Sequence, residues 1–99
     1  MDIQLRGTRG LTEDELFNIQ RISEKSMKAL ERILPDAKLT LVIKKQAKKG
    51  AKPQYNFQGR VDHPSLIFKA EALDWELAKA LHKMFNKLET EAHRKSDKY

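Results

Sequence analysis

The sequence contains no cysteine, only three prolines and four glycines, and no long hydrophobic run. The lack of cysteine excludes disulfides, thiolate nucleophiles and cysteine-ligated zinc, and it favours an intracellular, cytoplasmic protein. Because no apolar stretch approaches the ~20 residues that cross a bilayer, we expect no membrane segment. The first residues, MDIQLRG, lack the hydrophobic core of a signal peptide, so we expect no secretion either.

Reactive side chains are also sparse, and their spacing favours neither a catalytic nor a metal site. His63, His82 and His93 are scattered too widely to share a metal, and no cofactor is predicted. The D-H-P-S segment that contains His63 and Ser65 is typical of a turn rather than of a nucleophile with its base. The acids at 13–15 are those that the dipole of a helix start favours. The sequence therefore predicts a protein that is not an enzyme.

Lysine and arginine, in contrast, are abundant: 20 of them stand against 14 acids, which gives a net charge of +6. This balance favours an anionic partner, with nucleic acid first and an acidic membrane surface or acidic protein second. A hydrophobic content of 39% and a length of 99 residues suit one compact domain. We expect this domain to span residues 1–95 and residues 96–99 to form a flexible tail.

Hydrophobic periodicity and breaker residues predict two helices and four strands. The first helix follows the T-x-x-E spacing of a capping box, formed by Thr12 and Glu15, and ends near Leu34. The second helix is expected to start with Asp74 as its N-cap and to reach the low nineties. Alternating or β-branched segments predict strands at 2–6, 38–44, 52–61 and 66–72.

The predicted strands have one apolar and one polar face, the pattern of a sheet that is covered on one side only. The residues expected to point inward are Tyr55, Phe57, Val61, Leu66 and Phe68. Those expected to point outward from the third strand are Gln54, Asn56, Gln58 and Arg60. Both helices should therefore cover the same face. The predicted fold class is α+β: a two-layer β-α-β-β-β-α sandwich, with a four-stranded sheet and both helices packed on one face.

Basic residues gather on the side of each predicted helix that lies opposite its apolar arc, at 100° per residue. In the first helix this band contains Arg21, Lys25, Lys28 and Arg32. In the second helix it contains Lys79, Lys83, Lys87 and Arg94. Any soluble amphipathic helix has a charged face, but the separation of basic from acidic residues on both helices favours a polyanion-binding surface. The two bands should point away from the sheet together and frame a groove.

The segment KKQAKKGAK, residues 44–52, holds five lysines and is interpreted as the end of a strand followed by a hairpin tip. Because a loop holds charge less rigidly than a helix, its lysines are predicted to make auxiliary RNA contacts: Lys45, Lys48, Lys49 and Lys52. Base stacking would require exposed aromatic side chains. Trp75 is interpreted as a packing residue over the sheet edge, with an exposed stacking role as the less favoured alternative. Recognition of the shape and backbone of structured RNA is therefore favoured.

Three stretches share the order and spacing of a known family. IQLRG at 3–7 is similar to an opening strand of pattern I-x-I/L-x-G, and LTEDEL at 11–16 with KALERIL at 28–34 resembles a first helix. KAEALDWELAKAL at 69–81 resembles an A-E-x-x-D strand-to-helix junction. On these stretches the chain resembles the ribosome hibernation promoting factors, also described as ribosome-associated inhibitors or sigma-54 modulation proteins. It departs from them at 75–78, where a Met-Tyr-Ala-Ala-like run is usual, and no long C-terminal extension follows, so the resemblance implies a short-form or divergent member.

The resemblance implies a protein that binds the small ribosomal subunit in the channel used by mRNA and tRNA. Such proteins block translation and protect idle ribosomes in stationary phase or stress. The resemblance also implies that basic residues on the two helices contact rRNA, and these are the residues that the helical wheels select. We further expect a monomer off the ribosome, with neither a membrane nor a small-molecule substrate as a partner.

Two alternatives stay open. A generic double-stranded RNA-binding module also runs helix, three strands, helix, but its lysines cluster at the start of the last helix, where this chain has Asp74 and Glu76. That module also lacks the opening strand predicted here. A basic protein-interaction module would instead bind an acidic partner, and it would show no salt-sensitive binding of RNA.

Overall fold

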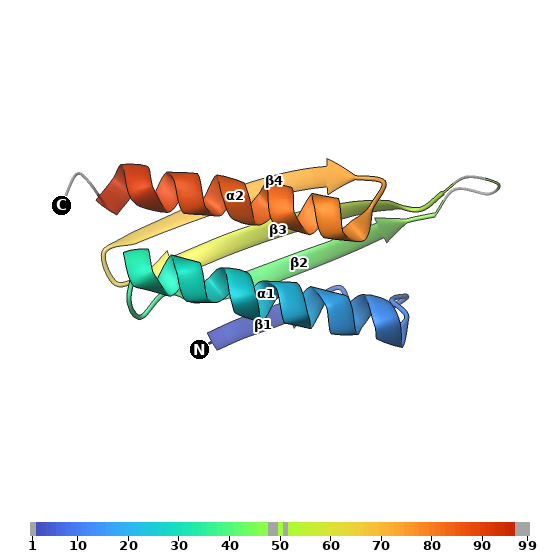
Figure 1. Ribbon diagram of the computed structural model, residues 1–99, viewed down its shortest axis with the longest axis horizontal. Helices are drawn as coiled ribbons and strands as arrows, with labels where there is room; N and C mark the ends of the chain where they lie inside the picture. The colour runs from blue at the N-terminus through green and yellow to red at the C-terminus, as the bar shows by residue number, and fades with distance from the viewer. Residues whose placement is uncertain (1, 48–49, 51, 97–99) are drawn as a thin grey trace.

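The computed structural model describes residues 2–47, 50 and 52–96, and this part of the chain contains the six predicted elements in the predicted order (Figure 1). These elements are β1 (Asp2–Arg6), α1 (Glu13–Ile33), β2 (Lys38–Gln46), β3 (Gln54–His63), β4 (Leu66–Asp74) and α2 (Leu77–Ser96). The predicted tail of residues 96–99 overlaps α2 only at Ser96, and the other three residues lie outside the described part.

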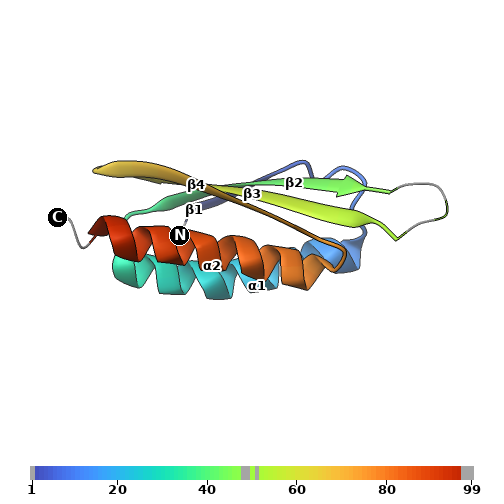
Figure 2. The same ribbon diagram turned by 90° about the horizontal axis from the view of Figure 1, so that it is seen from above.

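The four strands form one sheet in the order β1-β2-β3-β4, in which β1 pairs with β2 in parallel and the other pairs are antiparallel. Both helices lie on the same face of this sheet, as Figure 2 shows from above. The two-layer α+β prediction is confirmed. The helices lie side by side and run in the same direction, so both begin at the end of the molecule where the β2–β3 hairpin projects (Figure 1).

The core lies between the sheet and the helices and follows the predicted alternation. Tyr55, Phe57 and Val61 of β3 are buried, whereas the residues between them on the open face are partly or fully exposed. Gly59 is also on the covered face, and a Cβ atom there would lie 2.3 Å from the Sδ of Met84 and 2.9 Å from a Leu88 methyl. The lack of a side chain at this position therefore lets α2 pack close against β3. Each large aliphatic side chain buried in this core contributes roughly 1.5–3 kcal/mol.

The start of α1 is the predicted capping box. The Thr12 hydroxyl accepts a hydrogen bond of 3.1 Å from the Glu15 N–H, and the Glu15 carboxylate accepts one of 2.9 Å from the Thr12 N–H. Together they satisfy two amides that have no partner inside the helix. The helix ends at Ile33, and Leu34 forms the C-cap, as the sequence indicated.

Gly7 ends β1 at a point where only glycine fits. Its φ of 78° lies in the left-handed region, and a Cβ atom would lie 2.2 Å from the carbonyl oxygen of Ile43. The obstacle is backbone, which cannot rotate away as a side chain could. This close contact sets the path by which the chain leaves β1 for α1.

The prediction that Asp74 is the N-cap of the second helix is wrong, because Asp74 is the last residue of β4 and pairs across the sheet with Tyr55. α2 begins three residues later, at Leu77, and its first intrahelical bond runs from the Ala80 N–H to the Glu76 carbonyl at 3.0 Å. The Asp74 carboxylate instead accepts a 3.1 Å hydrogen bond from the Glu76 N–H. Its polar side chain thus stabilises the turn between strand and helix.

Candidate nucleic-acid interface

The outer face of α1 carries a band of four cations, which we call the α1 band: Arg21, Lys25, Lys28 and Arg32. All four side chains are exposed, on the side of the helix opposite the buried Ile19, Ile22 and Leu30. Within the described part of the chain, no carboxylate or carbonyl forms an ion pair or hydrogen bond with any of the four. Their donors are therefore available to an external anion without the loss of an internal contact.

The cations predicted on α2 are also exposed, but each of them contacts an acceptor of the protein itself. The pairs are Lys79–Glu76 at 3.2 Å, Lys83–Asp74 at 2.6 Å, Lys87 Nζ to the Glu71 carbonyl at 2.8 Å, and Arg94–Glu91 at 3.2 Å. An exposed ion pair such as Lys79–Glu76 contributes about 0–1 kcal/mol, so a strong external anion can replace the internal partner there.

Two of these contacts orient their lysines toward β4 instead of α1. Asp74 and Glu71 both belong to β4, so Lys83 and Lys87 lean over the outer flank of the molecule. The hydrogen bond from Lys83, followed by that from the Glu76 N–H, lowers the pKa of Asp74 below its ordinary value. The two helical bands thus lie on one side of the protein, but the α2 lysines spread outward rather than lining the predicted groove.

Lys28 also lies on an outer flank, on the opposite side of the helical layer. A hollow of about 390 Å³ between β1 and α1 is lined by Ile3, Leu5, Gln20, Ser23, Glu24 and Lys28. The hydroxyl of Ser23 is buried beside this hollow and has no hydrogen-bond partner among the described residues. The cations of the two helices therefore cover a broad surface that extends from the β1 edge to the β4 edge.

The lysine-rich segment begins inside β2, where Lys45 is held by the protein. Its Nζ lies 2.9 Å from Glu15 Oε1 and 5.9 Å from the centre of the Tyr55 ring. The Tyr55 hydroxyl donates a short hydrogen bond to the same carboxylate. Lys45, predicted as an auxiliary RNA contact, is half-buried in this cluster, whereas Lys52 is exposed. Lys48 and Lys49 lie outside the described residues.

This Glu15–Lys45–Tyr55 cluster shifts the pKa of two of its members. Burial alone would raise the pKa of Glu15, but the hydrogen bonds from Lys45, the Thr12 N–H and Tyr55 outweigh it and lower the pKa from 4.5 to about 2. Burial, together with the hydrogen bond to Glu15, raises the pKa of Tyr55 to about 12. The cluster is thus an ionised carboxylate between two donors, and it fixes the base of the hairpin to the start of α1.

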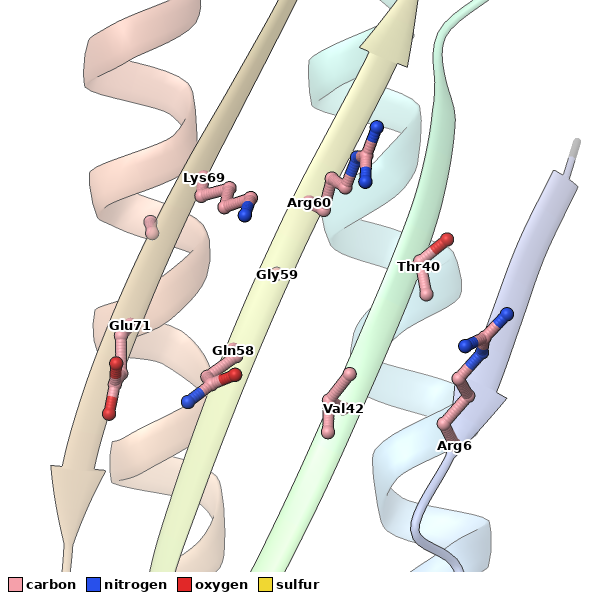
Figure 3. A pocket seen from close by; sticks show the side chains of 9 residues that line it. Arg6, Thr40, Val42, Gln58, Gly59, Arg60, Lys69 and Glu71 are labelled. Atoms are coloured by element: carbon pink, nitrogen blue, oxygen red, sulfur yellow. The ribbon is translucent and has the colours of Figure 1, made fainter.

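The open face of the sheet contains a hollow of about 540 Å³ (Figure 3). Its lining residues are Arg6, Thr40, Val42, Gln58, Gly59, Arg60, Lys69, Ala70 and Glu71. Arg60 pairs with Asp62 at 3.2 Å, and Glu71 accepts a hydrogen bond of 2.8 Å from Asn56. Sequence reasoning missed the cations Arg6 and Lys69, although the alternation of β1 and β4 already places both on the open face.

Trp75 does not pack over the sheet edge: 56% of it is exposed, so the packing interpretation is wrong. The reason is the late start of α2, which leaves Trp75 in the bend between strand and helix and gives the packing position to the partly buried Leu77. Phe17, on the second turn of α1, is 64% exposed.

The described residues contain no cluster of three or more histidine, aspartate or glutamate side chains that could hold a metal. His63 Nδ1 accepts a 3.1 Å hydrogen bond from the Ser65 N–H. This bond lies within a turn between β3 and β4, as the D-H-P-S segment predicted. Among the described helices, none is both long and apolar enough to cross a bilayer.

Fold and surface together define a small two-layer α+β domain whose helical face is suited to a polyanion. No protein-family model matches the chain, and a search of curated proteins finds no significant match. Among solved structures, a ribosomal subunit interface protein from Coxiella burnetii is 19% identical, with a TM-score of 0.64, over 98% of this chain and 99% of that one. The N-terminal domain of Protein Y from Thermus thermophilus is 23% identical, with a TM-score of 0.66, over 95% of this chain and 98% of that one. The chain therefore has the fold of these two proteins.

Proposed function

We propose that this protein is a ribosome hibernation factor, which binds the small ribosomal subunit in the mRNA and tRNA channel and blocks translation by occupying it. The observation that carries this proposal is the shared fold, over nearly the whole chain, with a ribosomal subunit interface protein and with Protein Y. The family resemblance of the sequence and the basic helical face support it independently. In this function the protein needs no catalytic group and no cofactor.

The α1 band is the part of this surface that we expect to contribute most to affinity. Its four cations can bind phosphates directly, whereas Lys83 and Lys87 must first leave Asp74 and the Glu71 carbonyl. Each neutralised phosphate releases counterions, so four contacts give a slope of log affinity against log salt of about −3 to −4. Between 50 and 200 mM salt, affinity should then fall by roughly a hundredfold.

The structure bears differently on the two alternatives. β1 is paired with β2 in this fold, whereas a generic double-stranded RNA-binding module lacks an opening strand. The observed fold therefore does not favour that alternative. A basic protein-interaction module has the same charges available, and only a binding experiment separates it from an rRNA-binding factor.

Sedimentation with separated ribosomal subunits over a range of salt concentrations tests the proposal. The wild-type protein should sediment with the small subunit, and salt should weaken this binding. Lys25→Glu with Lys28→Glu should lower affinity at least tenfold, and the same change at Lys83 and Lys87 should lower it less.

A matched control is the double variant Lys38→Glu with Lys69→Glu, which makes the same change in charge on exposed residues of the open sheet face. We expect it to keep most of the affinity. If the control loses as much affinity as the α1 variant, the helical face is not the interface. Absence of co-sedimentation at low salt would refute ribosome binding itself.

A further inference from the structure

The single tryptophan of the sequence, Trp75, is exposed, although large aromatic side chains are usually among the most buried. It lies in the short bend between β4 and α2, next to the start of the basic helical surface. Among the described residues, neighbouring elements leave more than half of it uncovered: Trp75 is 56% exposed. Its exposed ring is therefore available for a contact with another molecule.

The backbone on both sides of Trp75 is held in place. The residue before it, Asp74, pairs with Tyr55 in the sheet, and its carboxylate accepts hydrogen bonds from the Glu76 N–H at 3.1 Å and Lys83 Nζ at 2.6 Å. The side chain of Asp74 is only 17% exposed, although that of Lys83 is 56% exposed. The bend thus presents the indole on a fixed support, which lowers the entropy cost of a contact.

Two lysines of α2 lie near this bend, and each pairs with one of the acids that flank Trp75: Lys79 with Glu76 and Lys83 with Asp74. Lys79 lies about one helical turn further along α2, and it is exposed. The sheet register aligns Leu73 with Asn56 and Asn56 with Lys44, so Lys44 lies two strands from Leu73, at about 10 Å from it. Figure 1 shows that the starts of both helices lie at the same end of the molecule as the end of β2 and the start of β3.

We propose that Trp75 stacks on an unpaired nucleobase of the bound RNA, while Lys79 and Lys83 hold the phosphates on either side of that base. This inference rests on the proposed function and deepens it, since it adds base stacking to a surface so far described by phosphate contacts alone. Aromatic rings beside a basic track are the usual device for holding single-stranded nucleic acid without reading its sequence.

A nucleobase fits the surroundings of Trp75 better than a protein side chain does. An aromatic anchor of a protein interface is normally enclosed by a ring of further contacts that exclude water. The residues on either side of Trp75 in the chain, Asp74 and Glu76, are both charged, and Leu73 is the exposed apolar side chain nearest to it in the sequence. A base offers an apolar face for the indole, and its phosphates offer charge for the lysines.

Tryptophan emission, excited selectively over tyrosine, tests stacking directly, because Trp75 is the only tryptophan in the sequence. Short oligoadenylate at low salt should quench this emission as it binds. Inorganic polyphosphate supplies the same charge without bases and should leave the emission nearly unchanged. Equal quenching by both polymers, or no quenching by bound oligoadenylate, would overturn the inference.

Variants test the contribution of the ring to affinity. Trp75→Ala should weaken oligoadenylate binding roughly tenfold, and Trp75→Phe should restore most of it. Ile67→Ala is the matched control, because Ile67 is 55% exposed at the other end of β4, and this change should have no effect. Thermal unfolding of each variant checks that the fold is retained. We expect no loss of stability, because the side chains of Trp75 and Ile67 are both exposed.

Sedimentation of the same variants with small subunits separates this inference from the proposed function. If the wild type and Trp75→Ala bind equally well, ribosome binding stands and stacking is refuted. If the wild type does not bind subunits but oligoadenylate still quenches Trp75, ribosome binding fails and stacking stands. If Trp75→Ala weakens subunit binding while oligoadenylate leaves the emission unchanged, Trp75 contacts a protein and the inference is wrong.

Discussion

Replacement of Glu15 by glutamine should destabilise the protein at neutral pH and leave it almost unaffected in acid. The carboxylate of Glu15 accepts hydrogen bonds from Lys45 Nζ at 2.9 Å, from the Thr12 N–H at 2.9 Å and from the Tyr55 hydroxyl. Glutamine has nearly the same shape, so the change removes charge and one acceptor without opening a cavity. The variant therefore isolates the electrostatic contribution of this cluster.

The pKa of Glu15 sets an upper limit on the effect. Its shift from 4.5 to about 2 corresponds to about 3 kcal/mol at neutral pH, since each pKa unit equals ~1.4 kcal/mol. The side chain of Lys45 is 23% exposed, so solvent screens part of this interaction, and we expect a loss of about 2 kcal/mol. Because the folded pKa lies below the unfolded one, this stabilisation is complete above pH 4.5 and disappears as the pH falls toward 2.

Urea unfolding of the wild type and Glu15→Gln at several pH values measures this dependence. The difference in unfolding free energy should be about 2 kcal/mol near pH 7 and should approach zero near pH 2. Glu24→Gln is the control, because Glu24 is an exposed carboxylate on the same helix without a hydrogen-bonded partner among the described residues. A difference that does not change with pH would show that the loss comes from packing or capping rather than from the ionised carboxylate.

Three further changes test other features. Ser23→Ala removes a buried hydroxyl that has no hydrogen-bond partner among the described residues. It should stabilise the protein by about 1 kcal/mol, which raises Tm by roughly 4–8 °C in a calorimetric scan. Gly7→Ala forces a methyl group against a carbonyl oxygen at 2.2 Å and should cost at least about 2 kcal/mol in urea unfolding; a neutral result would mean that β1 ends differently. Replacing the hairpin lysines by alanine should lower small-subunit affinity only a few-fold in sedimentation, and a complete loss would make the hairpin the main site: Lys48, Lys49 and Lys52.

Features encoded by neighbouring residues could be predicted from the sequence. The capping box at Thr12 and Glu15 needs only a spacing of three, and the alternation of β3 needs only a period of two. The exposure of the α1 band also follows, because the wheel of a regular helix places cations opposite its buried arc. These features are local, so the sequence pattern and the folded structure agree.

Features that depend on contacts between distant segments could not be predicted. Glu15 is separated from Lys45 by 30 positions and from Tyr55 by 40, and no local pattern joins them. A helical wheel gives the direction of Lys83 and Lys87 relative to their own helix axis, but not the position of β4, which draws them outward. The exposure of Trp75 likewise depends on the start of α2, which lies two residues later than predicted, at Leu77 instead of Trp75.

The parallel pairing of β1 with β2 has a consequence for the order in which the domain assembles. β2, β3 and β4 are joined by hairpins, whereas Ile3 meets its partner Leu39 only after 36 intervening steps along the chain (39 − 3). Closing that long loop costs more entropy, so we expect the meander and α2 to form first and β1 to join last. β1 is also the shortest strand and lies at an edge, so its amides should exchange with solvent fastest among the strands. β1 lies beside α1, so its late pairing completes the sheet next to this helix. We therefore expect a newly made chain to acquire its full basic surface only at the last step of folding.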